Sequence, residues 1–516
     1  MSGADENQQT EETPLLDNGS ARSSSKERSD VSPVTLLIPV VLTTRLASQL
    51  PLTTFVDVVR QIICELWYAP DGDPIDGSTP EAVCDAPEVE RSFSAAITSI
   101  GILEAITALI VCAVLSYVAA RYGRKPVLLT VIAVSAMGCC LIAGAQIIPT
   151  WFGVWVLLAG IMFQSASNIL IYSCIVNMYV VDVSTTEKRR DFFFPSGFGA
   201  TISFALGGLI TTKTNNPLIV YYLSCLLFVA TFLYVFFFLP ESFPKEKRDE
   251  LRRRRLAETA DGHQPPTSSL LFFEPLKVLI PSYRPDGGRN WRLVWCAVHI
   301  FIVMTATTYA GMGFVVLVTT KYHLTPVQTG LFLSIASISS VFTLTIVVPL
   351  LVRFLRPFFQ RRVIHSAAQE EMLANDADTV ESETSDRLDV HLGFVSWVIC
   401  GVAYLCAVAS TTDAGLISSA ICLGASVARE PTFRSLVAGS TSPLKQGEAL
   451  AAIEMVASIG VCISPIIMGS ILTATISTMP WLVFYIHAVV VVIGGVVLYL
   501  VRDSDRHQHS HEITAS

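Results

Sequence analysis

The chain has 516 residues, of which 52% are hydrophobic and 15% are charged, and its formal net charge at pH 7 is −8. Soluble domains carry about 25% charged residues, and the mean hydropathy of this chain is +0.54, so we expect neither a soluble enzyme nor a nucleic-acid-binding protein. The apolar residues occur in runs of about 20, the length at which a helix spans a bilayer. These runs predict an all-α polytopic membrane protein.

The sequence offers no pattern for a metal, a cofactor or an enzymatic site. Its 12 cysteines are scattered, mostly inside apolar runs, without the CxxC or Cys/His spacing of zinc sites. It contains no Gly-x-x-x-x-Gly-Lys-Ser/Thr phosphate loop, no Gly-x-Ser-x-Gly and no His-Glu-x-x-His. We therefore expect no ATP hydrolysis, no intramembrane hydrolase, no cofactor and no metal.

The first 33 residues are polar and acidic, which predicts a disordered cytosolic tail over 1–33. Within it, Glu11-Glu12-Thr13-Pro14-Leu15-Leu16 fits the acidic dileucine pattern that sorts proteins to vacuoles or lysosomes. Chance occurrence in an acidic tail is the alternative. We expect a multi-pass protein of the plasma membrane or the vacuolar membrane.

An N-terminal six-helix bundle is predicted over residues 34–239. Its expected helices are 34–55, 92–119, 127–148, 151–181, 192–212 and 218–239. The loop 57–91 is acidic and rich in turn residues, and it should face outward. It contains Cys64 and Cys84, which an oxidising exterior would allow to form a disulfide; two free thiols are the alternative.

A basic cytosolic linker over 240–292 separates this bundle from a C-terminal six-helix bundle over 293–501. The expected helices of the second bundle are 293–318, 327–352, 392–409, 415–437, 448–473 and 481–501. A disordered insert over 353–391 and a cytosolic tail over 502–516 complete the chain. Lys and Arg gather in alternate loops, and because such loops face the cytoplasm, both chain ends should be cytosolic.

The turn between the second and third expected helices carries a recognisable motif. Gly123-Arg124-Lys125 follows Arg121, with Ser116 and Ala120 at the positions that precede them. This segment resembles the Gly-x-x-x-Asp-Arg-x-Gly-Arg-Lys loop of major facilitator superfamily transporters, with Ser for the first Gly and Ala for the acid. Two further segments resemble sequence patterns of that superfamily: Tyr179-Val180-Val181-Asp182, which precedes a basic cluster, and Pro240-Glu241-Ser242.

The resemblance implies 12 transmembrane helices in two pseudo-symmetric six-helix bundles around a central cavity, with alternating access. It also implies a gating motif of Ser116, Arg121, Gly123, Arg124, Lys125, Asp182 and Arg189. Glu430-Pro431-Thr432-Phe433-Arg434 followed by Lys445-Gln446-Gly447 resembles fungal members related to the proton-coupled folate transporter group. That resemblance does not name folate as the solute.

Ionisable groups inside the spans are the candidates for a transport site, because each costs about 2.5–3.5 kcal/mol in a bilayer unless it faces a partner or water. The candidates for the substrate and proton pathway are Arg45, Glu104, His299, Arg429, Glu430, Glu454, Asn168 and Asn177. The two asparagines on the fourth expected helix either line the cavity or bond between helices.

Each candidate has an alternative. Glu104 is either a proton carrier or the fixed partner of Arg45 in an ion pair, since burial raises the pKa of a carboxyl group. Glu430 and Arg434 have the favourable order for a pair four residues apart, which leaves Arg429 for the cavity.

His299 either titrates near neutral pH or forms a structural hydrogen bond. Glu454 is expected to pair structurally with Arg429 or Arg434. Pro431 should disrupt its helix near the binding site.

These features together predict a monomeric, proton-coupled secondary transporter of a small polar or charged organic solute. The partners expected are that solute, the proton and membrane lipid. A passive facilitator and a non-transporting nutrient receptor with the same fold are the alternatives.

Overall fold

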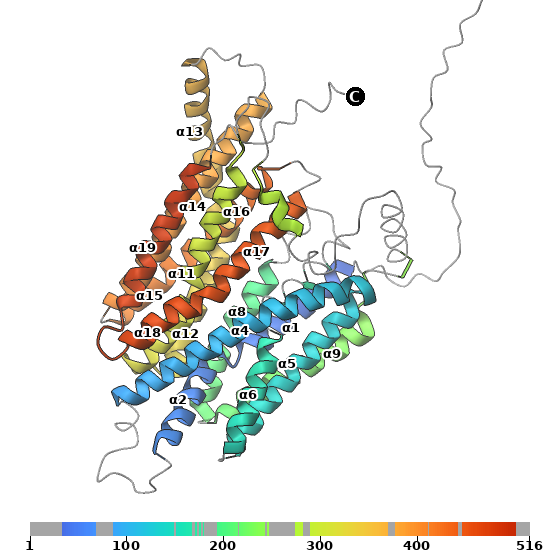
Figure 1. Ribbon diagram of the computed structural model, residues 1–516, viewed down its shortest axis with the longest axis vertical. Coiled ribbons are helices and arrows are strands. Elements are labelled where there is room, and N and C mark those ends of the chain that lie inside the picture. Colours follow the sequence, from blue (N-terminus) through green and yellow to red (C-terminus); the bar gives the residue numbers. More distant parts are fainter. Residues whose placement is uncertain are drawn as a thin grey trace, which may run out of the picture.

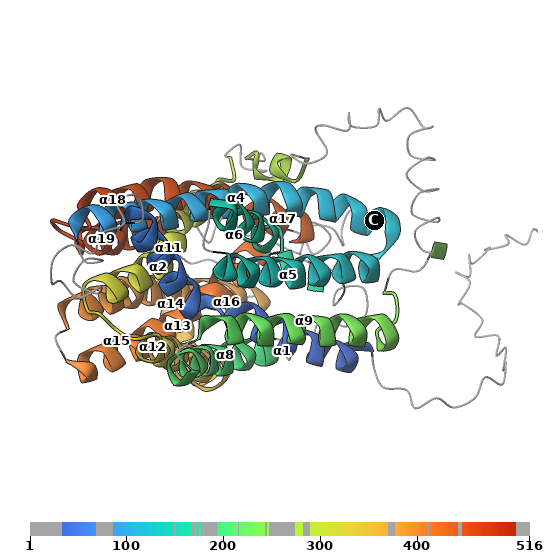
Figure 2. The same ribbon diagram turned by 90° about the horizontal axis from the view of Figure 1, so that it is seen from below.

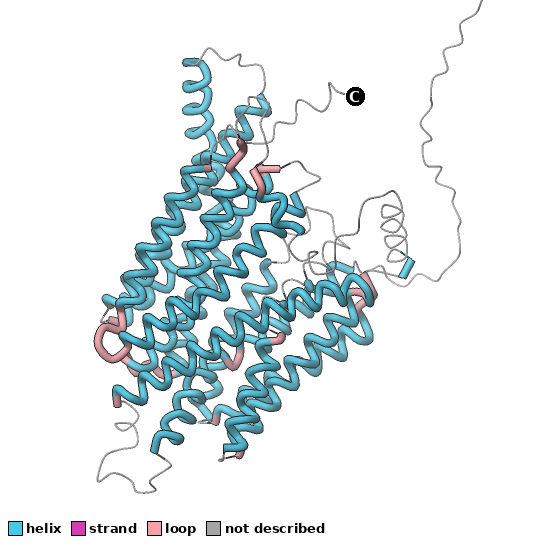
Figure 3. Tube along the Cα trace, viewed as in Figure 1, coloured by secondary structure: helices cyan, strands magenta, loops and turns pink. Residues whose placement is uncertain are grey.

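The computed structural model describes residues 33–68, 86–148, 151–167, 171–172, 175–176, 179, 193–214, 216–242, 245–246, 274–281, 289–369, 377–410, 412–441 and 446–501. These residues form long helices joined by short loops (Figure 3). Eight of the described helical stretches are long and apolar enough to cross a membrane.

The N-terminal half contains α1 (Pro33–Gln49), α2 (Leu52–Tyr68), α4 (Pro87–Tyr122), α5 (Arg124–Ile147), α6 (Trp151–Ser165), α8 (Phe193–Thr214) and α9 (Pro217–Phe238). Because α2 begins directly after the break that ends α1, the two together form one span. The described part of this half therefore has six helical units.

The C-terminal half contains α11 (Arg292–Thr320), α12 (Pro326–Phe342), η3 (Thr343–Val347), α13 (Val348–Gln369), α14 (Ala377–Ala409), α15 (Asp413–Ala425), η4 (Ser426–Ala428), α16 (Arg429–Ala438), α17 (Gln446–Ser464), η5 (Pro465–Gly469), α18 (Ser470–Thr475), α19 (Leu482–Val497) and η6 (Leu498–Leu500). A short 3₁₀ helix, η2 (Glu274–Leu279), precedes it. Segments that follow one another without a gap count as one helix, so the described C-terminal half also has six and the predicted twelve-helix fold is confirmed.

The two halves touch along two lines. Figure 2 shows α8 beside α12 on one side of the molecule and α4 beside α17 and α18 on the other. Helices α4 and α17 approach each other where α4 begins and α18 ends, and they diverge toward Tyr122 and Gln446 (Figure 1). The halves are therefore closed against each other at one end and apart at the other.

Local sequence signals start several helices. Asn216 accepts a hydrogen bond from the Leu218 backbone N–H at 3.0 Å, and Pro217 occupies the first helical position of α9. Thr325 and Gln328 form a capping box at the start of α12. These caps satisfy N–H groups that would otherwise lack partners in or near lipid.

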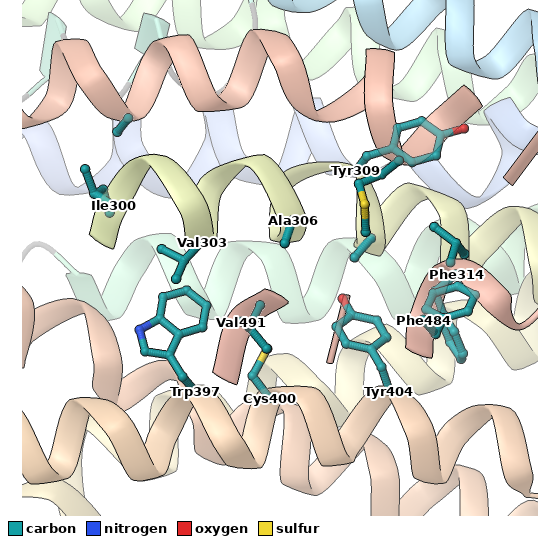
Figure 4. Packing of buried hydrophobic residues seen from close by; sticks show 14 of the residues in the cluster. Ile300, Val303, Ala306, Tyr309, Phe314, Trp397, Cys400, Tyr404, Phe484 and Val491 are labelled. Carbon is teal, nitrogen blue, oxygen red and sulfur yellow. The ribbon is translucent and has the colours of Figure 1, made fainter. Parts of the chain in front are cut away.

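The C-terminal half has the larger core, built around α11. Figure 4 shows Ile300, Val303, Ala306 and Phe314 of α11 with Trp397, Cys400 and Tyr404 of α14 and with Phe484 and Val491 of α19. Helices in a membrane gain little from the hydrophobic effect and associate through close packing. At Gly401 an added Cβ would lie 3.2 Å from the Ala488 Cα, which shows how closely α14 and α19 approach.

The first helix differs from its expected range of 34–55. It breaks at Leu50-Pro51 and resumes as α2, which continues to Tyr68 and so extends into the expected loop 57–91. Proline disfavours helical backbone at the residue before it, and this accounts for the break. Since α4 already begins at Pro87, Glu90 and Arg91 are also helical.

The expected disordered insert 353–391 is largely helical where it is described. Helix α13 continues to Gln369, and α14 begins at Ala377, well before the expected start at residue 392. For α14 the physical reason is tertiary: Asp386 is buried against Arg292 with its carboxylate 2.7 Å from the guanidinium, which stabilises the part of α14 before residue 392.

Candidate functional site

Arg45 lies near the end of α1, one turn before the break at Pro51, and its side chain is half-buried. The charge of Glu430, on α16 of the other half, acts on it. The expected pairing of Arg45 with Glu104 stays a prediction.

Glu104 is half-buried near the middle of α4. It is not free, since it has an interaction partner of its own. Its role as a proton carrier stays a prediction.

Arg429 is positioned by an irregular stretch of the tenth helix. Helix α15 ends at Ala425, the 3₁₀ turn Ser426–Ala428 follows, and Arg429 begins α16. Its Nη1 donates to the Ser426 carbonyl oxygen at 2.8 Å and to the Ser426 hydroxyl, and its guanidinium lies 4.6 Å from the Trp397 ring centroid. Contact with an aromatic face stabilises a cation in a site with little water.

Glu430 and Pro431 come next and are exposed. Pro431 falls in the first turn of α16, where a missing N–H costs nothing, so the irregular stretch precedes the proline. Arg434 pairs with Glu454 of α17 at 3.4 Å, not with Glu430. Because both of these side chains are more than half exposed, this pair contributes little to stability.

His299 is fully buried and structural in its contacts. Its Nδ1 lies 2.7 Å from the Gly494 carbonyl oxygen, and its ring packs against Trp397 and Phe433 at centroid distances of 5.8 and 5.1 Å. These contacts tie α11 to α19, α14 and α16. They favour the expected alternative of a hydrogen-bonded structural histidine.

The ionisable residues inside the spans that escaped the sequence reasoning include His487 and Asp57. His487 of α19 is fully buried, with Nδ1 3.1 Å from the Ala306 carbonyl oxygen, and the charge of Arg429 acts on it. Asp57 lies in α2, half-buried, where the charge of Arg60 acts on it. His487 was visible as a polar residue within an apolar run, whereas Asp57 was assigned to a loop because the first helix was ended too early.

The turn that carries the Gly123-Arg124-Lys125 motif, here called the motif turn, has a defined geometry. Gly123 adopts φ of +109°, and a side chain there would meet the Glu241 carboxylate at 2.6 Å. Glu241 accepts hydrogen bonds from the Arg124 and Lys125 backbone N–H groups at 2.7 and 3.2 Å, and Lys125 Nζ donates to the Phe236 carbonyl oxygen at 2.9 Å. A carboxylate at a helix N-terminus is favourable, so the Pro-Glu-Ser segment fastens the end of α9 to the start of α5.

The remaining predicted residues are only partly described. Ser116 lies within α4, and Arg121 lies at the end of that helix, 5.7 Å from the Tyr122 ring centroid. Asn168, Asn177, Asp182, Arg189 and Cys84 lie outside the described residues. Cys64 is disulfide-bonded, and its predicted pairing with Cys84 stays a prediction.

Comparison with known proteins agrees with this fold. The sequence matches the family description Major Facilitator Superfamily over residues 86–368 and 383–515. Among solved structures, the fold is similar to the human organic anion transporter MFSD10, with a TM-score of 0.56 and 14% identity over 90% of this chain and 99% of that one. It is similar in the same degree to the nucleoside transporter NupG, with a TM-score of 0.56 and 16% identity over 91% and 99% of the two chains.

Two curated relatives are fungal. The chain is 33% identical to the major facilitator-type transporter psiT1 of Psilocybe cyanescens, over 74% of this chain and 86% of the relative. It is 25% identical to the uncharacterized membrane protein C14C4.07 of Schizosaccharomyces pombe, over 64% of this chain and about half (52%) of that relative.

The chain belongs to the major facilitator superfamily. It is a multi-pass membrane transporter that binds and moves a solute, and it is not an enzyme. The finer resemblance to relatives of the folate transporter group stays a prediction.

Proposed function

We propose that this protein is a proton-coupled secondary transporter that moves a small polar or charged organic solute by alternating access. Residues 34–239 and 293–501 would be the two moving units, joined by the basic linker 240–292. The observation that carries this proposal is that both halves place charged residues inside their helices, Arg45 on α1 and Arg429 and Glu430 on α16, and that the charge of Glu430 acts on Arg45. Opposite charges inside spans are costly, and transporters retain them where they serve a pathway.

A carboxylate whose charge acts on a guanidinium can couple proton binding to solute binding. When Glu430 takes up a proton, Arg45 loses its counter-charge and becomes available to an anionic or polar group of the solute. Glu430 is exposed and so can receive that proton from water. Glu104, half-buried on α4, is the second carboxylate that could carry a proton along the same path.

Arg429 supports the same reading. Its guanidinium is held by Ser426 and by the Trp397 ring, which leaves donor groups on its other nitrogens for a ligand. A guanidinium fixed before the solute arrives binds with a smaller loss of side-chain entropy.

The test begins with the solute, which a metabolite comparison between deletion and overexpression strains would identify. Flux of that solute into proteoliposomes should then follow an imposed pH gradient. The Glu430→Gln and Arg45→Gln variants should lose this response. Glu88→Gln should keep it, because Glu88 is exposed at the start of α4 and provides a matched carboxylate outside the pathway.

Two other results would overturn the proposal. Flux that ignores both the pH gradient and the Glu430→Gln and Glu104→Gln variants would identify a passive facilitator. Binding of the solute without any flux would identify a nutrient receptor that kept the fold.

For location, we propose the plasma membrane or the vacuolar membrane, a monomer, and both chain ends in the cytosol. Tags on the two ends should both be accessible from the cytosolic side of sealed vesicles. Tags found on opposite sides would contradict an even number of spans.

A further inference from the structure

One end of the molecule is joined across the two halves by an ion pair. Lys321, just after α11, places its Nζ 2.9 and 2.8 Å from the two carboxylate oxygens of Glu90 in the first turn of α4. The Glu90 side chain is 6% exposed and the Lys321 side chain 31%. Because the carboxylate is buried, this pair is worth more than a fully exposed one, and removing the lysine leaves the Glu90 charge buried without this counter-charge.

A layer of hydroxyl groups lies deeper along the same contact. The Thr98 hydroxyl lies 2.9 Å from the Tyr309 hydroxyl and 3.2 Å from that of Thr473. Ser94 is hydrogen-bonded to Thr473 at 3.0 Å. Glu90, Ser94 and Thr98 are four residues apart, so they form one stripe along α4.

The partners of this stripe all come from the C-terminal half. Tyr309 lies on the side of α11 turned away from Trp397 and Tyr404 (Figure 4), so its ring is directed to the other half and not into its own core. Gly469 allows the close approach, since a Cβ there would lie 2.5 Å from the Thr98 side chain. This face is thus built for contact with α4.

The second line of contact is closed at the same end. A Cβ on Gly208 of α8 would lie 2.3 Å from the Pro326 carbonyl oxygen at the start of α12, and one on Gly330 would lie 2.3 Å from the Phe204 carbonyl oxygen. At the far end α4 and α17 diverge (Figure 1). The solute pathway in this conformation is therefore closed on the Glu90 side.

We propose that Glu90, Lys321, Ser94, Thr98, Tyr309 and Thr473 form the gate that holds this end shut, and that the Glu90–Lys321 pair is its latch. This inference requires the two halves to move apart, but it does not depend on proton coupling. In each transport cycle the ion pair and the hydroxyl contacts must break together for the pathway to open on this side. Weakening the latch shifts the population toward the conformation that is open on the Glu90 side.

A labelling experiment tests the latch without knowledge of the solute. Ser94 is fully buried under the latch, so a Ser94→Cys variant should react slowly with a maleimide reagent. Mass spectrometry of the peptide that contains residue 94 measures the rate and separates it from labelling of native cysteines. Adding Glu90→Gln or Lys321→Gln should raise this rate about tenfold, because the reactive fraction follows the opening equilibrium.

The charge-reversed double variant Glu90→Lys/Lys321→Glu restores an ion pair and should bring the rate back close to that of Ser94→Cys alone. Glu88→Gln changes an exposed carboxylate two residues away and should leave the rate unchanged. A thermal unfolding curve for each variant separates gate opening from general unfolding.

The proposal is overturned if adding Glu90→Gln or Lys321→Gln leaves the labelling rate at that of Ser94→Cys alone. It is also overturned if the charge-reversed double variant is labelled as fast as these two variants. Either result can be obtained whether or not transport is coupled to protons.

Discussion

Arg292 is the most deeply buried charge that the structure describes, and its contacts explain why it is tolerated. Its Nη2 lies 2.7 Å from the Asp386 carboxylate, and its Nε donates to the Ser440 hydroxyl at 2.8 Å. Both charged side chains are at most 3% exposed. The pair joins the starts of α11 and α14 to the end of α16, the helix that carries Arg429 and Glu430.

Removing one member of this pair should be far more harmful than removing both. Arg292→Met should cost about 3–5 kcal/mol of stability, because the buried Asp386 carboxylate loses the guanidinium that lies 2.7 Å from it, whereas Arg292→Met/Asp386→Leu should recover most of the loss. Thermal unfolding in detergent checks this. Arg434→Met, which breaks an exposed pair, is the matched control and should change stability by about 1 kcal/mol or less; a double variant as unstable as the single would contradict the prediction.

At the scale of helices, α8 and α12 form the longest contact between the halves, and glycine makes it possible. Gly208 and Gly330 face the backbone of the opposite helix, as the short distances from an added Cβ show. Ser334 adds a hydrogen bond to the Thr201 carbonyl oxygen at 3.1 Å. Small residues of this kind let helix backbones approach each other in a membrane.

A larger side chain in this contact should act on the gate from the other side of the molecule. Gly330→Val would force α12 away from Phe204, so the closed end should separate and residue 94 should be labelled about tenfold faster, as in the latch variants. The measurement is the same maleimide reaction of Ser94→Cys. Gly144, which has nothing within 4 Å of an added Cβ, is the control position, and Gly144→Val should leave the rate unchanged. An unchanged rate in Gly330→Val would show that the two lines of contact do not open together.

For the molecule as a whole, the proposed alternating access makes the contact stripe and the diverging far end one of two conformations. Helix α4 reaches from the gate to the motif turn at Gly123, and α5 is fastened there to α9 through Glu241. Under the proposed mechanism, the N-terminal half moves as a unit when the gate opens and carries Arg45 with it.

A crosslink across the gate should stop this motion. Ser94→Cys/Thr473→Cys replaces two hydroxyl groups that lie 3.0 Å apart, a separation from which a disulfide can form with small adjustments. Oxidation should abolish solute flux in proteoliposomes, and a reducing agent should restore it. The single variants under the same oxidant should keep their flux. Undiminished flux with the crosslink formed would mean that this end does not open during transport.

Much of the fold followed from the sequence. Hydrophobic runs located the spans, Pro and Gly located turns, and the Gly123-Arg124-Lys125 turn with Pro240-Glu241-Ser242 pointed to the superfamily. These signals are local, because each depends on residues close together in the chain. The same locality explains the errors. An early end for the first helix hid Asp57, and a late start for the second hid Glu90. The polar composition of 353–391 concealed the start of α14, which a distant partner, Arg292, stabilises.

The hydropathy of the chain by itself determined that it is a bundle of membrane helices. In lipid every backbone N–H and C=O group needs a partner within the protein, and a long apolar run provides these partners by forming a helix. Only the tertiary structure decided which charges meet. Arg434 pairs with Glu454, Glu90 meets Lys321, and the charge of Glu430 acts on Arg45, because helices far apart in sequence cross at particular depths and rotations. Periodicity along one helix carries no information about its register against another, so the gate and the opposed charges arise from packing.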